Sequence, residues 1–84
     1  MSGPILANVY SAEGSINGTV TVTFPWRPRK TIVTNDSSLS NLVVTIKGSN
    51  MTLKPMETLT LMLIIEDLIL TTSASVAYRV WGFG

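Results

Sequence analysis

Alternation of apolar and polar residues is the dominant pattern along this chain, and it indicates β-strands. From residue 19 to 24 the alternation is unbroken, which predicts that Val20, Val22 and Phe24 face a core while three threonines face outward. Segments 42–47 and 76–82 alternate in the same way. The residues predicted on their inner faces are Leu42, Val44, Ile46, Val76, Tyr78 and Val80.

Turn-forming residues interrupt this pattern at short intervals. Predicted loops lie at 13–15, 17–18, 24–29, 35–41, 48–50, 66–67 and 73–75, so the segments between them give seven or eight short strands. Such spacing is typical of a small antiparallel β-sandwich, jelly-roll-like or immunoglobulin-like. The chain shows no linker or repeat. We therefore expect a single all-β domain over 1–84, with residues 1–7 as an N-terminal arm able to add to a neighbouring sheet.

One segment, 58–65, is apolar on both faces in its second half. Leucines and Ile65 lie on one face, and Met62 and Ile64 lie on the other. A strand covered on both sides, in the domain interior or at a subunit contact, has this pattern. A helix over 56–69 is the alternative, because the segment is rich in helix-forming residues. The apolar run 59–70 is too short for a membrane span, and Glu66 and Asp67 interrupt it.

The composition predicts a protein that is covered by a partner. The chain has 84 residues, of which 45% are hydrophobic and 13% charged, and its mean hydropathy is +0.37. A chain this short buries a modest fraction of its surface, and little charge is left to cover the rest. We expect a homo-oligomer or a docked subunit.

Charge and residue content exclude several functions. A net charge of +1 gives no electrostatic footprint for nucleic acid or an anionic membrane. Without cysteine or histidine there is no disulfide, no thiolate zinc site and no imidazole base. The first residues lack the basic and long apolar regions of a secretory signal peptide.

The five acidic residues form no persuasive catalytic pair, and glycine-rich phosphate loops and a Ser-x-x-Lys motif are absent. For adjacent Glu66 and Asp67, a solvated turn is the simpler explanation. We therefore expect no enzyme, no cofactor and no metal.

The stretch 24–30 carries the clearest candidate for partner docking. It places three of the six basic residues beside a tryptophan, on a loop stiffened by two prolines. Trp26, Arg27 and Arg29 are of the types enriched at binding hot spots. In the alternative, Trp26 folds back to plug the end of the sandwich while the arginines stay in water. Trp81 and Phe83 pose the same question, since they close the core or are buried against a neighbouring subunit.

Four phrases carry a resemblance to a known group of proteins. They are TIVTNDS at 31–37, LVVTI at 42–46, MTLKPMETL at 51–59 and YRVWG at 78–82. Over residues 19–84 the chain resembles small virion proteins of tailed bacteriophages, in which a "TLKPGET"-like turn precedes a final aromatic strand ending in glycine. Met56 stands where that turn has glycine.

The resemblance implies a β-sandwich that decorates or cements a capsid, or an accessory subunit of the tail or fibre. The size of the chain favours decoration. Such a protein would sit on the capsid surface, over junctions of the major capsid protein, often as a trimer. The alternative is an adhesion or carbohydrate-binding module of a tail tip or fibre, with Trp26, Tyr10 and Tyr78 as a stacking platform for a surface glycan.

Overall fold

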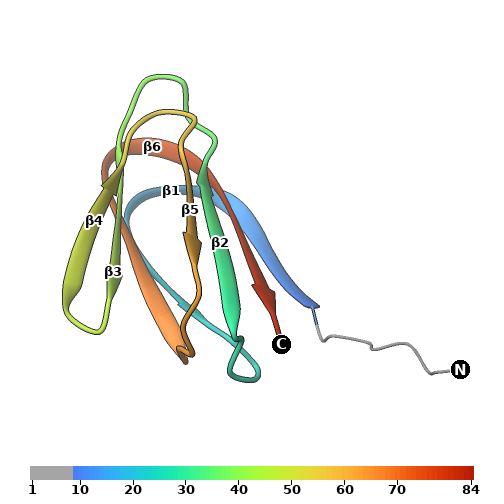
Figure 1. The fold of residues 1–84 in the computed structure, drawn as a ribbon. Coiled ribbons are helices and arrows are strands. Elements are labelled where there is room, and N and C mark those ends of the chain that lie inside the picture. The colour runs from blue at the N-terminus through green and yellow to red at the C-terminus, as the bar shows by residue number, and fades with distance from the viewer. Residues whose placement is uncertain (1–8) are drawn as a thin grey trace, which may run out of the picture.

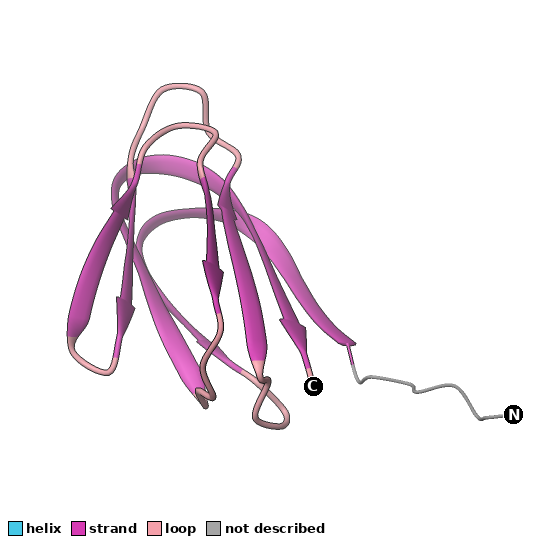
Figure 2. Cartoon of the chain, viewed as in Figure 1, coloured by secondary structure: helices cyan, strands magenta, loops and turns pink. Residues whose placement is uncertain are grey.

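The protein is built from β-strands in a computed structural model that describes residues 9–84 (Figure 1, Figure 2). The strands are β1 (Val9–Thr23), β2 (Lys30–Asn35), β3 (Leu42–Ile46), β4 (Ser49–Leu53), β5 (Thr58–Leu61) and β6 (Asp67–Phe83). Residues 9–84 contain no helix, so the helical alternative for 56–69 is wrong. The predicted arm 1–7, and the start of the strand expected near it, lie outside the described residues.

The strands form one antiparallel sheet that curls into a half-barrel (Figure 1). Its order is β4-β3-β6-β2-β5, and β1 lies along the other side of β6. The length of β6 makes this order possible. Residues 69–71 of β6 pair with β3 and residues 78–83 pair with β2, so β6 belongs to both halves of the sheet. The bend between these two parts turns the halves toward each other.

Six strands are observed where seven or eight short ones were predicted. The predicted loops at 13–15, 17–18 and 73–75 are absent, because β1 and β6 run through them as one long ribbon. The register of this ribbon shifts once, between Ile16 and Gly18, so that 73–75 form an irregularity rather than a loop. There the Thr72 hydroxyl donates to the carbonyl of Ala74 at 2.8 Å and accepts from its N–H at 3.2 Å, which satisfies the local backbone.

The predicted facing of the strands is confirmed. Val22, Phe24 and the predicted inner residues of β3 and β6 are buried, except Ile46 and Val20, which are partly buried and pack against the core. The threonines of β1 at 19, 21 and 23 are exposed. In β6 the buried side is even-numbered along its whole length, with residues 68, 70, 72, 76, 78, 80 and 82 buried.

The segment predicted as a strand over 58–65 is shorter in the structure. β5 ends at Leu61, and the chain then leaves the sheet as a loop before β6 begins. Ile65 is buried, but Met62 is 74% exposed and Ile64 is 55% exposed. The apolar residues on both faces are therefore not covered within this chain.

A buried asparagine ties the loops at one end of the half-barrel together. Asn35, at the end of β2, is fully buried, and its side-chain nitrogen donates to carbonyl oxygens of Ser40, Leu53 and Lys54 at 2.9–3.2 Å. Its side-chain oxygen accepts from the N–H of Ser37 at 2.9 Å. One side chain thus joins the loop after β2 to the turn between β4 and β5.

Candidate interaction surfaces

An apolar groove lies along the open side of the half-barrel, between the β3–β4 hairpin and β5. Its volume is about 270 Å³. The residues that line it are Val44, Ile46, Lys47, Ser49, Asn50, Met51, Leu59, Leu61 and Leu63. The strands on its two sides, β4 and β5, are the end strands of the sheet order and do not pair with each other. The sheet is therefore open here, and the groove gives access to its apolar inner face.

Uncovered apolar side chains gather around this groove. Eight large hydrophobic residues are exposed among those described; two of them, Met51 and Leu63, line the groove, and Met62 and Ile64 are the sequence neighbours of Leu63. Two more, Leu39 and Met56, lie on loops that are joined by the hydrogen bond from the Met56 N–H to the Ser37 carbonyl, at 3.1 Å. Exposed apolar patches on small proteins mark contact sites. We call the groove and the exposed segment 62–64 the open seam.

The loop 24–29 is present as predicted, and its tryptophan folds back toward the chain. Trp26 is half-buried and lies against the last residue, since a Cβ on Gly84 would stand 2.7 Å from its ring. Pro28 is fully buried. Arg27 and Arg29 are exposed. The tryptophan therefore covers Gly84, while the two arginine side chains stay in solvent, as the alternative predicted.

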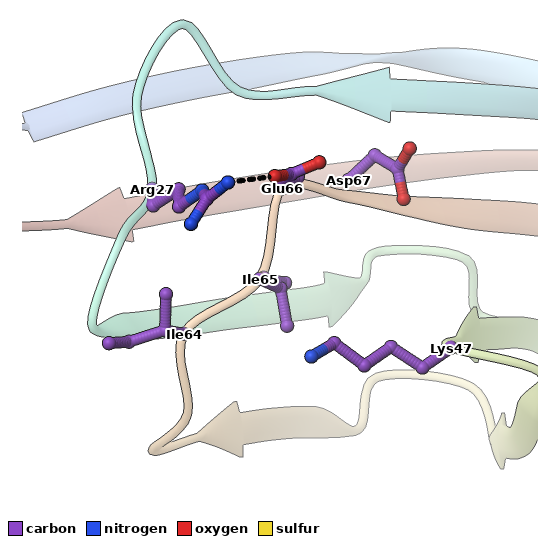
Figure 3. A pocket seen from close by; sticks show the side chains of 6 residues that line it. All are labelled: Arg27, Lys47, Ile64, Ile65, Glu66 and Asp67. Atoms are coloured by element: carbon purple, nitrogen blue, oxygen red, sulfur yellow. Dashed lines mark hydrogen bonds and ion pairs between the residues drawn. The ribbon is translucent and has the colours of Figure 1, made fainter.

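Arg27 forms an ion pair with Glu66 beside a second, larger hollow of about 500 Å³. Figure 3 shows the pair on one side of this hollow and Lys47 extending toward Ile65 on the other. Both partners are about two-thirds exposed, with side-chain accessibilities of 68% and 66%. Such an ion pair contributes little stability. Glu66, expected in a solvated turn, is thus paired with a residue of the loop 24–29, which we call the docking loop.

Trp81 and Phe83 lie together on the outer face of β6. Their rings stack at 6.5 Å with an interplanar angle of 14°. The Lys30 ammonium lies 5.9 Å from the centre of the Phe83 ring, within the range of a cation–π contact. Trp81 is 38% exposed. Because Arg29 donates its N–H to the Phe83 carbonyl at 2.8 Å, the docking loop and this aromatic pair adjoin.

An ion pair that the sequence pattern did not predict lies on the same outer face. Arg79 of β6 binds Asp36 through two bonds, Nε to Oδ2 at 2.7 Å and Nη2 to Oδ1 at 3.0 Å. The hydrogen bond to Asp36, and then its charge, raise the pKa of Arg79. The partners are 43 residues apart, so only the pairing of β2 with β6 brings them together. Asp36 therefore holds the side chain of Arg79 in place, in addition to its predicted role in the turn after β2.

The glycan platform suggested for Trp26, Tyr10 and Tyr78 is not present. Tyr78 is only 9% exposed and belongs to the core. Tyr10 packs edge-on against Phe24, with ring centres 5.6 Å apart. The prediction that Tyr78 lies on an inner face is confirmed, and it is incompatible with a role of Tyr78 in an exposed glycan platform.

Over residues 9–84, no group of three acidic, cysteine or histidine residues is arranged to hold a metal ion. Within the same residues, no helix is long and apolar enough to cross a membrane.

No protein-family model and no curated protein sequence matches the chain, but solved structures do. A cupin-2 domain containing protein from Shewanella frigidimarina NCIMB 400 aligns with a TM-score of 0.61 at 9% identity, over 93% of this chain and 72% of that one. The ethanolamine utilization protein EutQ from Salmonella typhimurium LT2 aligns with a TM-score of 0.60 at 14% identity, over 89% of this chain. This chain spans 57% of the EutQ length.

A designed protein shows that this fold does not require a longer chain. A de novo designed double-stranded β-helix aligns with a TM-score of 0.58 at 13% identity, covering 89% of this chain and 99% of the design. The chain therefore has a cupin-like double-stranded β-helix fold, which is the jelly-roll-like alternative of the prediction. A C-terminal domain of A223, a structural protein from Sulfolobus turreted icosahedral virus, aligns with a TM-score of only 0.45, which is too distant to carry an argument.

Proposed function

We propose that this chain is a structural subunit that acts by binding other protein subunits, as a decoration protein on the capsid of a tailed bacteriophage. The observation that carries the first part is the open seam, where apolar side chains stay uncovered in a chain that has few charges. The sequence resemblance supplies the second part. In this role the chain needs no catalytic residue and no cofactor.

Two surfaces serve the two contacts that a decoration subunit needs. The open seam is apolar and suits a permanent contact with further copies of the chain. The adjoining docking loop and aromatic pair offer Arg27, Arg29 and Trp81, which are exposed and of the kinds that dominate binding energies. We assign this second surface to the major capsid protein.

The mechanism is stabilisation by mass action. A subunit that binds only the assembled shell lowers the free energy of that shell by RT ln(1 + [L]/Kd) per site, where [L] is its free concentration. At a concentration of 100 Kd, this is about 2.7 kcal/mol per site. Repeated over many sites, the effect opposes the pressure of packaged DNA without any chemical step.

Quantitative mass spectrometry of purified virus particles tests this function. We expect hundreds of copies of the chain per particle, in a fixed ratio to the major capsid protein. A few copies per particle would place the chain on the tail instead, and its absence from particles would refute a virion role.

A binding assay on particles tests the assigned surface. The double variant Arg27→Ala with Arg29→Ala is expected to lose most of its binding to particles that lack the chain, because both side chains are exposed and charge-bearing. Lys54→Ala is the control, since it removes one exposed positive charge on the β4–β5 turn. Equal binding by the wild-type protein and the double variant would remove the loop from the contact.

A further inference from the structure

The edge of β5 is uncovered in a way that edge strands of soluble proteins usually avoid. On one side β5 pairs with β2, and within residues 9–84 no strand pairs with its other side. Natural edge strands are protected by lysines, prolines or bulges. The sequence of β5, Thr-Leu-Thr-Leu, contains none of these residues. The uncharged stretch continues through Met62, Leu63 and Ile64, all exposed.

The register of β5 fixes which backbone groups are free. The N–H of Asn35 donates to the carbonyl of Glu57 at 3.0 Å, so this pair is a hydrogen-bonded one. In an antiparallel ladder such pairs alternate with non-hydrogen-bonded pairs. Leu59 and Leu61 therefore direct their backbone groups to β2, whereas Thr58 and Thr60 direct theirs to the open edge.

We propose that this edge pairs antiparallel with β5 of a second copy, about a two-fold axis near Thr60. The inference deepens the proposed function, on which it rests, by naming the surface through which the subunit binds itself. In a two-fold contact the residues near the axis meet their own copies, so a charge there would repel itself. Residues 58–65 carry no charge, whereas Glu57 and Glu66 flank the segment on either side.

The same geometry restricts the register. The free backbone N–H and carbonyl groups of Thr58 and Thr60 find partners only if these threonines lie opposite residues of the second copy whose backbone groups also face the open edge. Such a register places leucine opposite leucine, because residues opposite each other share a face of the sheet. Leu59 and Leu61 of both copies then form one continuous apolar row beside the groove.

Single cysteines test the pairing directly, because the natural chain has none. We expect Leu59→Cys, Thr60→Cys or Leu61→Cys to form a disulfide-linked dimer under mild oxidation, fastest at the residue on the axis. Thr21→Cys, on an exposed position of β1, is the control. Fastest linkage at the control position, or no linkage at any of the three, would overturn the proposal.

A charge on the axis provides a second test that needs no oxidation. Wild-type protein is expected to sediment as a dimer, and Thr60→Lys is expected to raise the dimer dissociation constant by more than about tenfold, since two lysines would then face each other. Thr21→Lys should leave it unchanged. A wild-type monomer, a trimer, or a dimer insensitive to Thr60→Lys would refute the β5 contact. Any of these results leaves the copy number in virus particles as an independent test of the proposed function.

Discussion

The ring of Phe24 packs directly on the backbone of Gly82. Phe24 is the first residue of the docking loop after β1, and Gly82 lies near the end of β6. A Cβ at Gly82 would stand 3.1 Å from Cε1 of Phe24 and 3.3 Å from Cβ of Pro28. Phe24 and Pro28 are both buried, so neither side chain has free space into which to move. The absence of a side chain at position 82 is therefore what lets the loop close over the core.

We expect Gly82→Ala to destabilise the protein by about 1–3 kcal/mol, the usual cost of overpacking a core. Urea denaturation followed by circular dichroism measures this change. Gly14→Ala is the matched control in β1, because its nearest contact, the Tyr78 hydroxyl, is at an ordinary 3.4 Å. If the two variants were equally stable, the close approach at Gly82 would not limit packing.

Met56 adopts the left-handed conformation that glycine accepts most readily, with φ at 67°. It is 66% exposed, so its side chain contributes little to packing. Met56→Gly is expected to raise the free energy of unfolding by about 0.5–1 kcal/mol, because the strain removed exceeds the added freedom of the unfolded chain. Thermal unfolding should show a higher melting temperature.

Met51→Gly is the control for this turn. Met51 is also exposed, at 49%, but it lies within β4 and has no positive φ. Glycine there removes a strand residue and should destabilise the protein. A loss of stability in both variants would show that Met56 is held by contacts rather than strained.

The sequence pattern predicted local features well. The resemblance marked position 56 as one that has glycine in related turns, and the positive φ confirms that the turn keeps a glycine-like geometry. Alternation predicted the facing of β3 and of the second half of β6, because the core selects apolar residues at every second position. The prolines likewise predicted the loop 24–29.

The boundaries of β1 and β6 could not be predicted from local composition. Gly14, Ser15 and the small residues at 73–75 are typical of loops, yet both segments lie within strands, and residue 74 keeps the even-numbered inward side of β6. What keeps them in strands is the pairing of β1 with β6, between residues about 60 positions apart. Their smallness instead suits the bend of the long ribbon.

Only part of the candidate site could be predicted. Composition indicated the docking loop and the terminal aromatic residues, but their adjacency depends on the bond between Arg29 and Phe83. Residues 58–65 were predicted to be covered either in the domain interior or at a subunit contact, and the structure shows that the chain itself leaves residues 62–64 exposed. The second half of this segment is apolar on both faces, so no polar residue marks the point where the strand leaves the sheet.

Thr31 is a polar residue whose burial lacks compensation. It is fully buried in β2, and its hydroxyl has no hydrogen-bond partner in the structure. Thr31→Val replaces the hydroxyl with a methyl group of similar shape, so we expect a gain of about 1 kcal/mol in the free energy of unfolding. Chemical denaturation measures it. Thr19→Val on the exposed side of β1 should change little, and a loss at Thr31 would indicate an unseen partner for the hydroxyl.

Asn35 is the polar residue whose burial is fully compensated, and a single atom change tests its role. In Asn35→Asp a carboxylate oxygen replaces the nitrogen that now faces the carbonyls of Ser40, Leu53 and Lys54. Acceptors then meet acceptors in a buried site, so we expect a loss of about 3 kcal/mol or more at neutral pH.

The pH dependence of this variant separates electrostatics from packing. Burial beside carbonyl oxygens favours the neutral acid and raises the pKa of the introduced carboxyl above its unfolded value. The folded state then binds the proton more tightly, so stability relative to wild type is greatest below about pH 4 and falls as pH rises through the folded pKa. Asn41→Asp, at an exposed loop position, should show no such trend. No loss at any pH would mean that Asn35 acts through its shape alone, whereas a loss at neutral pH that recovers in acid would show that its donated hydrogen bonds hold the two loops together.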